Sequence, residues 1–402
     1  MSERALYLRL SAFYLLYYGA VGCFVPYWPL YLRDSGHSAW VVGMAFAVLG
    51  TLRIGVPLLW GRVMDRRGQR MPVIVVTMLI CSALFAVMPH VHHSLALLLG
   101  LHAAYALFWN AALPAFDVIT LHSTRHTRLD YSQIRLWGSV GFVVTVLGCG
   151  ALVESYGAGV VHPMVAVLML AMVALGLYIP DTQGGARVQP VRGALLRHLR
   201  QPSVVALLIT AFLSQLAFAP FYSFFSIYLQ EHGYSSAVTG QLWALGVIAE
   251  IGVFVVASRL LMRYGVRATL LFSLASGVLR WALLALAVDQ LYWLAFSQFL
   301  HFASFGLYHT ATVVCMHRLF PEHLHGQAQA LLAGLSFGAG GAIGNLMTGY
   351  AWDALGGPVV FMGAAAAAAL GWLVVATALR DPAPQPIPDR RTAGDSENPR
   401  PR

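Results

Sequence analysis

The chain has 402 residues, of which 58% are hydrophobic and only 10% are charged, whereas soluble domains carry about 25% charged residues. This composition excludes an ordinary soluble domain and indicates a protein that lies in the lipid bilayer. All 25 basic residues are arginine, which excludes a lysine-bearing phosphate loop for ATP-driven pumping and a lysine Schiff base.

Apolar runs in the sequence predict the membrane-spanning helices. A helix needs about 20 apolar residues to cross a bilayer, because unpaired backbone groups in lipid cost several kcal/mol each. Such runs lie near 7–32, 38–60, 71–89, 94–121, 134–156 and 159–179, and then near 203–229, 236–258, 268–288, 292–317, 326–350 and 358–379. We therefore predict an all-α membrane protein with twelve transmembrane helices.

The arginines predict the topology. All except Arg33, Arg53 and Arg280 lie at the N-terminus, in alternate loops or in the tail, so the positive-inside rule places both termini in the cytoplasm. The net charge of +9 then needs no nucleic-acid partner. Residues 180–202 are polar, basic and punctuated by proline, and residues 381–402 have a composition typical of disorder. We expect an N-terminal half (1–179), a cytoplasmic linker (180–202), a C-terminal half (203–380) and a disordered tail (381–402).

The two halves repeat each other. The segment YLRDSGHSAWVVG from Tyr31 matches YLQEHGYSSAVTG from Tyr228 at a shift of 197 residues, and LHAAYALFWN (101–110) matches LHFASFGLYH (300–309) at a shift of 199. Two halves of the same orientation are typical of secondary transporters, whose substrate site lies near the membrane midplane between the repeats.

The four cysteines, Cys23, Cys81, Cys149 and Cys315, occur one to a run without a CxxC spacing. Neither a disulfide framework nor a metal site is therefore expected, and we expect no cofactor. The glycine-rich segment 337–344 is interpreted as a place of close helix packing.

The loop GRVMDRRGQR (61–70) resembles the signature loop of the major facilitator superfamily. The resemblance implies the fold of that superfamily, a monomer in a bacterial-type inner membrane, and a conformational gate formed by Gly61, Asp65, Arg66, Gly68 and Arg70. The second copy, SRLLMRYGVR, has Ser258 and Met262 in place of Gly61 and Asp65, so its gate should be weaker.

Ionisable residues inside the runs are functional candidates, because burying them in a membrane is costly, although structural pairs are the alternative. They are Arg53, Asp117, Arg135, Glu250, Arg280, His102, His301 and His309. Arg53 and Glu250 occupy equivalent places in the repeat. If the histidines are neutral, the three arginines of this set carry one more charge than its two acids, Asp117 and Glu250. The remaining positive charge predicts a monoanionic substrate.

The segments NAALPAFDVITL and RLWGSVGF resemble lactose permease, in which an acid and an arginine at these places bind sugar. The chain is still more similar to the phenylpropionate permease branch, in DYSQIRLWGSVGF, in GQLWALGVIAEI around Glu250 and in SGVLRW around Arg280. The resemblance implies that Asp117 and Arg135 bind substrate, and with the buried arginines, the repeat and the aromatic residues we predict a substrate site that includes Arg53, Asn110, Asp117, Arg135, Arg280 and Trp281.

Ser304 replaces the glutamate that carries the coupled proton in lactose permease. We therefore predict that Glu250 carries the proton, with His301 and His309 as the next candidates. An anion bound at Arg280 would screen that charge and raise the proton affinity of Glu250. Asp117 and Arg135 are predicted to pair, either to orient the substrate or to close the cytoplasmic end, and a purely structural pair is the alternative.

Several candidates have an ordinary structural alternative. His301 could simply donate to a carbonyl group, while its repeat partner His102 and the equivalence of Asn110 and His309 favour a ring of residues around a cavity. Tyr27, Trp28, Tyr222, Phe225, Trp243 and Trp281 could stack on an aromatic ligand, but aromatic residues in membrane helices more often pack or form interface belts.

The predicted function is proton-coupled import of a small organic acid across the lipid bilayer. A drug-exporting antiporter is the alternative, although residues 136–155 lack the proline expected there. Sugars or nucleosides remain open as substrates. No arrangement of nucleophile, base and orienting group predicts an enzyme.

Overall fold

The computed structural model describes residues 2–91, 93–125, 127–181 and 194–381, and every regular element in these ranges is a helix. In the first half these are α1 (Glu3–Asp34), α2 (Ala39–Leu52), α3 (Val56–Arg67), α4 (Met71–Val87), η1 (Met88–His90), α5 (Leu95–Thr124), α6 (Tyr131–Tyr156), η2 (Ala158–Val160) and α7 (Val161–Gly176). Then follow α8 (Ala194–His198), α9 (Pro202–Glu231), α10 (Ser236–Tyr264), α11 (Val266–Leu286), α12 (Leu291–Phe299), η3 (Phe302–Leu307), α13 (Tyr308–Leu319), η4 (Glu322–Leu324), α14 (His325–Ala333), η5 (Gly334–Gly340) and α15 (Gly341–Ala378).

The twelve predicted spans are all found in the described ranges. Ten helices are long and apolar enough to cross a membrane, and the bent pair α2 and α3 makes an eleventh span. The longest of the ten runs from Glu322 to Ala378. Gly356 interrupts it with φ 78° and ψ 164°, a backbone conformation that glycine adopts readily. The predicted spans 326–350 and 358–379 lie on either side of Gly356, so this helix supplies two spans.

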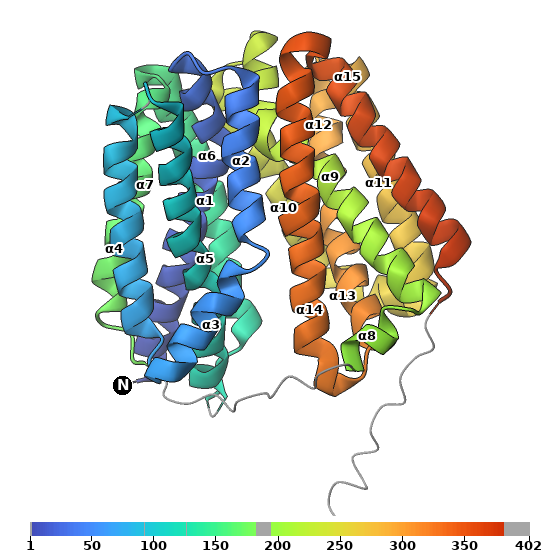
Figure 1. Ribbon diagram of the computed structural model, residues 1–402, viewed down its shortest axis with the longest axis horizontal. Helices are drawn as coiled ribbons and strands as arrows, with labels where there is room; N and C mark the ends of the chain where they lie inside the picture. The colour runs from blue at the N-terminus through green and yellow to red at the C-terminus, as the bar shows by residue number, and fades with distance from the viewer. Residues whose placement is uncertain (1, 92, 126, 182–193, 382–402) are drawn as a thin grey trace, which may run out of the picture.

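The helices form two bundles, α1–α7 and α9–α15 (Figure 1). Part of the predicted linker (182–193) and nearly all of the predicted tail (382–402) lie outside the described residues. The N-terminus, α3 and α8 lie at one end of the molecule (Figure 1), which we call the arginine-rich end. The turns that follow α1, α6, α9 and α11 lie at the other end, which we call the opposite end.

The second predicted span, 38–60, is not one continuous helix. The chain leaves the helix after Leu52, and α3 starts at Val56 with a bend of 42°. Pro57 lies in the first turn of α3. In a continuous helix its ring would clash with the carbonyl of Arg53, and it has no N–H to donate. The break therefore places Arg53 at a helix end in the middle of the span.

At the opposite end, carboxylates of each half bind a helix N-terminus of the other half. Asp353 Oδ2 accepts a hydrogen bond from the backbone N–H of Ala39 at 3.0 Å, and Glu154 Oε2 accepts one from Ser236 at 2.7 Å. The two contacts are equivalent in the repeat, because the shifts of 197 and 199 residues carry Ala39 onto Ser236 and Glu154 onto Asp353. Arg33 adds an ion pair with Asp353 at 3.3 Å.

Glycines bring the same helix pairs into close contact. A Cβ atom at Gly43 of α2 would lie 2.6 Å from the carbonyl oxygen of Asn345 in α15, and one at Gly240 of α10 would lie 2.7 Å from that of Val146 in α6. These pairs are again equivalent in the repeat. The hydroxyl of Tyr27 donates to the Val146 carbonyl at 2.8 Å. The opposite end is thus closed by two matching helix contacts.

Candidate functional site

Among the described residues of the C-terminal half, Arg280 in α11 is the largest charged side chain that is fully buried, with a relative exposure of 0%. Its Nη1 donates to His301 Nδ1 at 2.8 Å and to Ser304 Oγ at 3.4 Å, and its Nη2 donates to Gln298 Oε1 at 3.1 Å. Its Nε has no hydrogen-bond partner in the described part of the chain. Arg280 therefore keeps at least its Nε–H donor available for a ligand.

Aromatic rings surround this guanidinium. Its central carbon lies 4.3 Å from the ring centroid of Phe221, 4.5 Å from that of Trp281 and 5.4 Å from that of Phe218. Cation–π contacts of this kind stabilise a buried cation, but they do not neutralise it. A buried charge without a directly paired counterion is costly, so the site is suited to an anion.

His301 connects Arg280 to Glu250. Arginine has only donors, so His301 Nδ1 must accept the Arg280 hydrogen bond. The neutral imidazole then carries its proton on Nε2, which lies 3.3 Å from Glu250 Oε2 in α10. Arg280, His301 and Glu250 thus form one hydrogen-bonded chain, although they come from three different helices. The sequence named all three residues, but it did not show that His301 links the other two.

A π-helix positions this chain of residues. The segment η3 (Phe302–Leu307) follows His301 directly and contains Ser304. Its Gly306 lies against α10, where an added Cβ would lie 2.7 Å from Val253 and 3.4 Å from Glu250 Cγ. Single π-turns are rare and often occur at functional sites. The wider turn lets Ser304 and His301 both reach Arg280.

A second charged cluster lies in the N-terminal half. Asp117 Oδ1 accepts hydrogen bonds from the hydroxyls of Tyr14 at 2.6 Å and Tyr131 at 3.1 Å. Arg135 donates to the hydroxyl of Tyr18, and its guanidinium also lies over the Tyr18 ring, 4.2 Å from the centroid. Within the described ranges, the predicted direct ion pair of Asp117 and Arg135 is not found in this conformation. Tyrosine hydroxyls bind both charged groups instead.

Electrostatic interactions connect the two clusters. The charges of Glu250 and Arg135 both act on His309, and those of Glu250, Arg280 and Arg53 all act on Tyr222. Arg53 is exposed, and its guanidinium lies 6.0 Å from the Phe337 ring centroid of the other half. It does not pair with its repeat equivalent Glu250. Asn110 donates to the Ala106 carbonyl of its own helix at 2.8 Å. Arg53 thus contacts the other half, whereas Asn110 is held by its own helix.

Comparisons with known proteins identify the family of this chain. The model of the MFS_1 like family matches residues 7–362. The chain belongs to this family. It is 31% identical over 352 residues to a protein of Escherichia coli (strain K12) described as a "probable 3-phenylpropionic acid transporter", covering 85% of this chain and 90% of the relative. It is 28% identical to the maltose permease of Geobacillus stearothermophilus, covering 84% and 86%.

A solved structure shows the same fold. The crystal structure of the nucleoside transporter NupG superimposes with a TM-score of 0.81 at 15% identity, covering 93% of this chain and 99% of that one. The chain is therefore a transporter of the major facilitator type, as its sequence predicted, and not an enzyme.

In this member of the family His102, the repeat equivalent of His301, has a different environment. It is fully buried. Its Nε2 accepts from Trp28 Nε1 at 2.8 Å, and its Nδ1 bonds to the Leu98 carbonyl at 2.7 Å. Both ring nitrogens are therefore satisfied inside the bundle. The interpretation of His102 as part of a ring around a cavity is wrong, because the side chain is fully buried and Trp28 and the Leu98 carbonyl occupy both of its ring nitrogens.

The predicted gate loop lies at the arginine-rich end. Arg70 pairs with Asp65 at 2.9 Å, and the backbone N–H of Arg70 donates to Asp181 at 3.1 Å. Gly61 and Arg66 are exposed, and Gly68 ends α3 with φ 66°. In the second copy Met262 replaces Asp65, and Arg267 donates instead to the Ala376 carbonyl at 2.6 Å. That copy thus lacks the internal ion pair of the first.

Proposed function

We propose that this transporter imports a small organic acid together with a proton, and that the acid is an aromatic monocarboxylate such as 3-phenylpropionate. The observation that carries the proposal is the buried guanidinium of Arg280, which has an unpartnered Nε, an aromatic surround that includes Trp281, and a hydrogen-bonded connection to Glu250. A carboxylate would bind the guanidinium through charge-assisted hydrogen bonds. The similarity to the phenylpropionate relative supports this choice of acid.

The connection to Glu250 explains how binding and protonation are coupled. A substrate carboxylate at Arg280 would screen the positive charge that reaches Glu250 through His301. The carboxyl of Glu250 would then bind a proton more tightly. Substrate and proton therefore load together, and both leave when the site opens to the cytoplasm. Asp117, Arg135, Asn110 and Arg53 are proposed to contact the remainder of the substrate from the N-terminal half.

The state described here is inward-facing in this proposal. The opposite end, which is closed, would face the outside of a bacterial-type inner membrane, and the arginine-rich end with both termini would face the cytoplasm. Rocking of the two halves would expose the site alternately. The loop 61–70 would act as the cytoplasmic gate, and the protein would work as a monomer.

The test is uptake of labelled 3-phenylpropionate into proteoliposomes under an inward proton gradient, with an uncoupler as control. We expect accumulation that the uncoupler abolishes. Glu250→Gln should retain exchange but lose accumulation. Arg280→Lys, which keeps the charge but loses the planar set of donors, should weaken substrate binding by about tenfold to a hundredfold, since a hydrogen bond to a charged group contributes about 1.5–3 kcal/mol. Unchanged accumulation by Glu250→Gln would remove the coupling scheme.

Neutral substrates are the second candidate. The cluster of Asp117 with two tyrosine hydroxyls offers hydrogen bonds to hydroxyl groups, and one relative is a maltose permease. Competition of the labelled uptake by maltose or by a nucleoside would favour this alternative, whereas competition by other aromatic carboxylates would favour the organic acid.

A further inference from the structure

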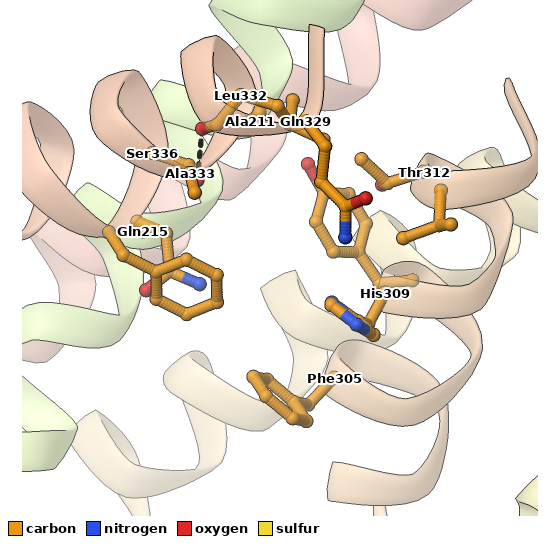
Figure 2. Close-up of a pocket in the computed structure, with 12 residues that line it drawn as sticks. Ala211, Gln215, Phe305, His309, Thr312, Gln329, Leu332, Ala333 and Ser336 are labelled. Carbon is orange, nitrogen blue, oxygen red and sulfur yellow. Dashed lines mark hydrogen bonds between the residues drawn. The ribbon is translucent and has the colours of Figure 1, made fainter. Parts of the chain in front are cut away.

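A pocket lies beside His309, between α9, α13 and α14 and against the π-helix η5 (Figure 2). Its cavity volume is about 80 Å³. Its polar groups come from Gln215, Tyr308, His309, Thr312, Gln329 and Ser336. None of the lining residues carries a permanent charge. We call this cavity the His309 pocket.

Two hydroxyl groups in this lining have no partner. Tyr308 and Thr312 are only 6% and 5% exposed. Their hydroxyls lie near each other, and the hydroxyl of Ser214 also lies near that of Tyr308, but neither Tyr308 nor Thr312 has a partner at full hydrogen-bonding geometry in the described part of the chain. Buried polar groups are normally satisfied by protein or water. A polar cavity needs only about 10–15 Å³ to hold a water molecule, so the pocket has room for a small cluster of waters.

The pocket begins where the buried chain of Arg280, His301 and Glu250 ends. The Phe305 ring stacks on His301 at 5.0 Å and on His309 at 6.1 Å between centroids, and it lines the pocket. His309 is exposed, and the charge of Glu250 acts on it. From the pocket, both α13 and α14 extend toward the arginine-rich end (Figure 1). The pocket thus lies between the buried chain of Arg280, His301 and Glu250 and the arginine-rich end.

We propose that the His309 pocket is the proton-release site of this transporter and that water is its ligand. The inference rests on the proposed function, in which Glu250 carries the proton. The O–H bond of the Glu250 carboxyl breaks as its proton passes to an intervening water, that water gives up a proton in turn, and an N–H bond forms on the His309 imidazole. That proton then passes to a pocket water, which leaves as hydronium at the arginine-rich end. The Glu250 carboxylate again accepts the hydrogen bond of His301.

The hydroxyls of Tyr308 and Thr312 hold and orient the water in this scheme. Removing both, by Tyr308→Phe with Thr312→Val, changes the shape of the protein very little. Thr210→Val is the matched control, because the Thr210 hydroxyl in α9 is also buried without a partner in the described ranges but does not line the pocket. The variants are compared in proteoliposomes that contain a pH-sensitive dye, with labelled 3-phenylpropionate as the substrate.

Two rates are measured, namely exchange of substrate across the membrane and release of protons during net uptake. In the double variant we expect proton release to fall by about tenfold or more while exchange stays within about twofold of wild type, because only the proton transfer step loses its positioned groups. Thr210→Val should leave both rates unchanged. Proton release at the wild-type rate in the double variant would overturn the inference, and so would a parallel loss of exchange and release.

Failure of the proposed function would give a different experimental result from failure of this inference alone. If wild-type protein takes up the substrate without moving protons, the coupling scheme and this inference fall together. If wild type moves both and Glu250→Gln loses only accumulation, the coupling scheme stands, and the double variant then decides the role of the pocket alone.

Discussion

His301 has both ring nitrogens committed, and this limits where a proton can reside. Nδ1 accepts from Arg280, and Nε2 faces Glu250. A second proton on the ring would turn Nδ1 into a donor that faces another donor. His301 could bind that proton only if Arg280 moved away. We infer that His301 transmits the charge of Arg280 and that Glu250 carries the proton.

His301→Asn tests this division of roles. The asparagine oxygen can replace Nδ1 toward Arg280, but the shorter side chain does not reach Glu250. We expect exchange of substrate within about threefold of wild type and a loss of proton-driven accumulation, because a lost hydrogen bond to Glu250 removes only the coupling interaction. Both are measured by proteoliposome uptake.

His301→Leu is the control, because it removes both contacts and leaves Arg280 Nη1 without its closest partner. We expect this variant to be destabilised by about 1–3 kcal/mol in thermal unfolding. Normal accumulation by His301→Asn would instead show that Glu250 does not depend on this bridge.

At the scale of the elements, irregular helices surround the site. The break between α2 and α3 exposes Arg53, the π-helix η3 brings Ser304 to Arg280, and the π-helix η5 borders the His309 pocket. Most of the glycines predicted to allow close packing do so, since a Cβ at Gly340 would lie 2.6 Å from the Phe212 carbonyl oxygen, but one at Gly341 would meet nothing within 4 Å in the described part of the molecule.

The contact of α2 with α15 should control the closed state of the opposite end. Gly43→Leu would force these helices apart, because its Cβ alone would lie 2.8 Å from the Cα of Gly349. We expect a cysteine introduced at Ser236, on the neighbouring closing contact, to react roughly tenfold faster with a membrane-impermeant maleimide, since overpacking costs about 1–3 kcal/mol.

Gly252→Leu in α10 is the matched control, because a Cβ there meets nothing within 4 Å in the described part of the molecule. Its labelling rate should equal that of wild type. Equal rates for Gly43→Leu and Gly252→Leu would mean that the glycine contact does not hold the opposite end closed.

At the scale of the whole molecule, the two carboxylate contacts hold the halves together. A carboxylate at a helix N-terminus is stabilised by the helix dipole, by about 0.3–1 kcal/mol. We expect Asp353→Asn and Glu154→Gln each to increase labelling of the opposite end, and the two effects to add in the double variant, because the sites share no partner. A double variant that labels no faster than wild type would contradict a closing role.

The sequence was sufficient to predict the twelve spans and the two halves, because run length and repeat register are local properties of the chain. It could not predict the binding of Asp117 and Arg135 to tyrosine hydroxyls or the satisfied state of His102. Both depend on tyrosine and tryptophan side chains of α1 that reach the site only after folding. The π-helices were equally hidden, because an extra residue in a turn leaves the hydropathy of a run unchanged.

The paired contacts of the opposite end also limit the path of the transport cycle. The contacts of Asp353 with Ala39 and of Glu154 with Ser236 are two copies of one interaction, related by the repeat. A rigid rotation of one half against the other stretches both copies by the same amount, so neither can open first without bending a helix. Their equilibrium constants therefore multiply, and a change that weakens each copy tenfold would alter the population of the outward-open state by about a hundredfold.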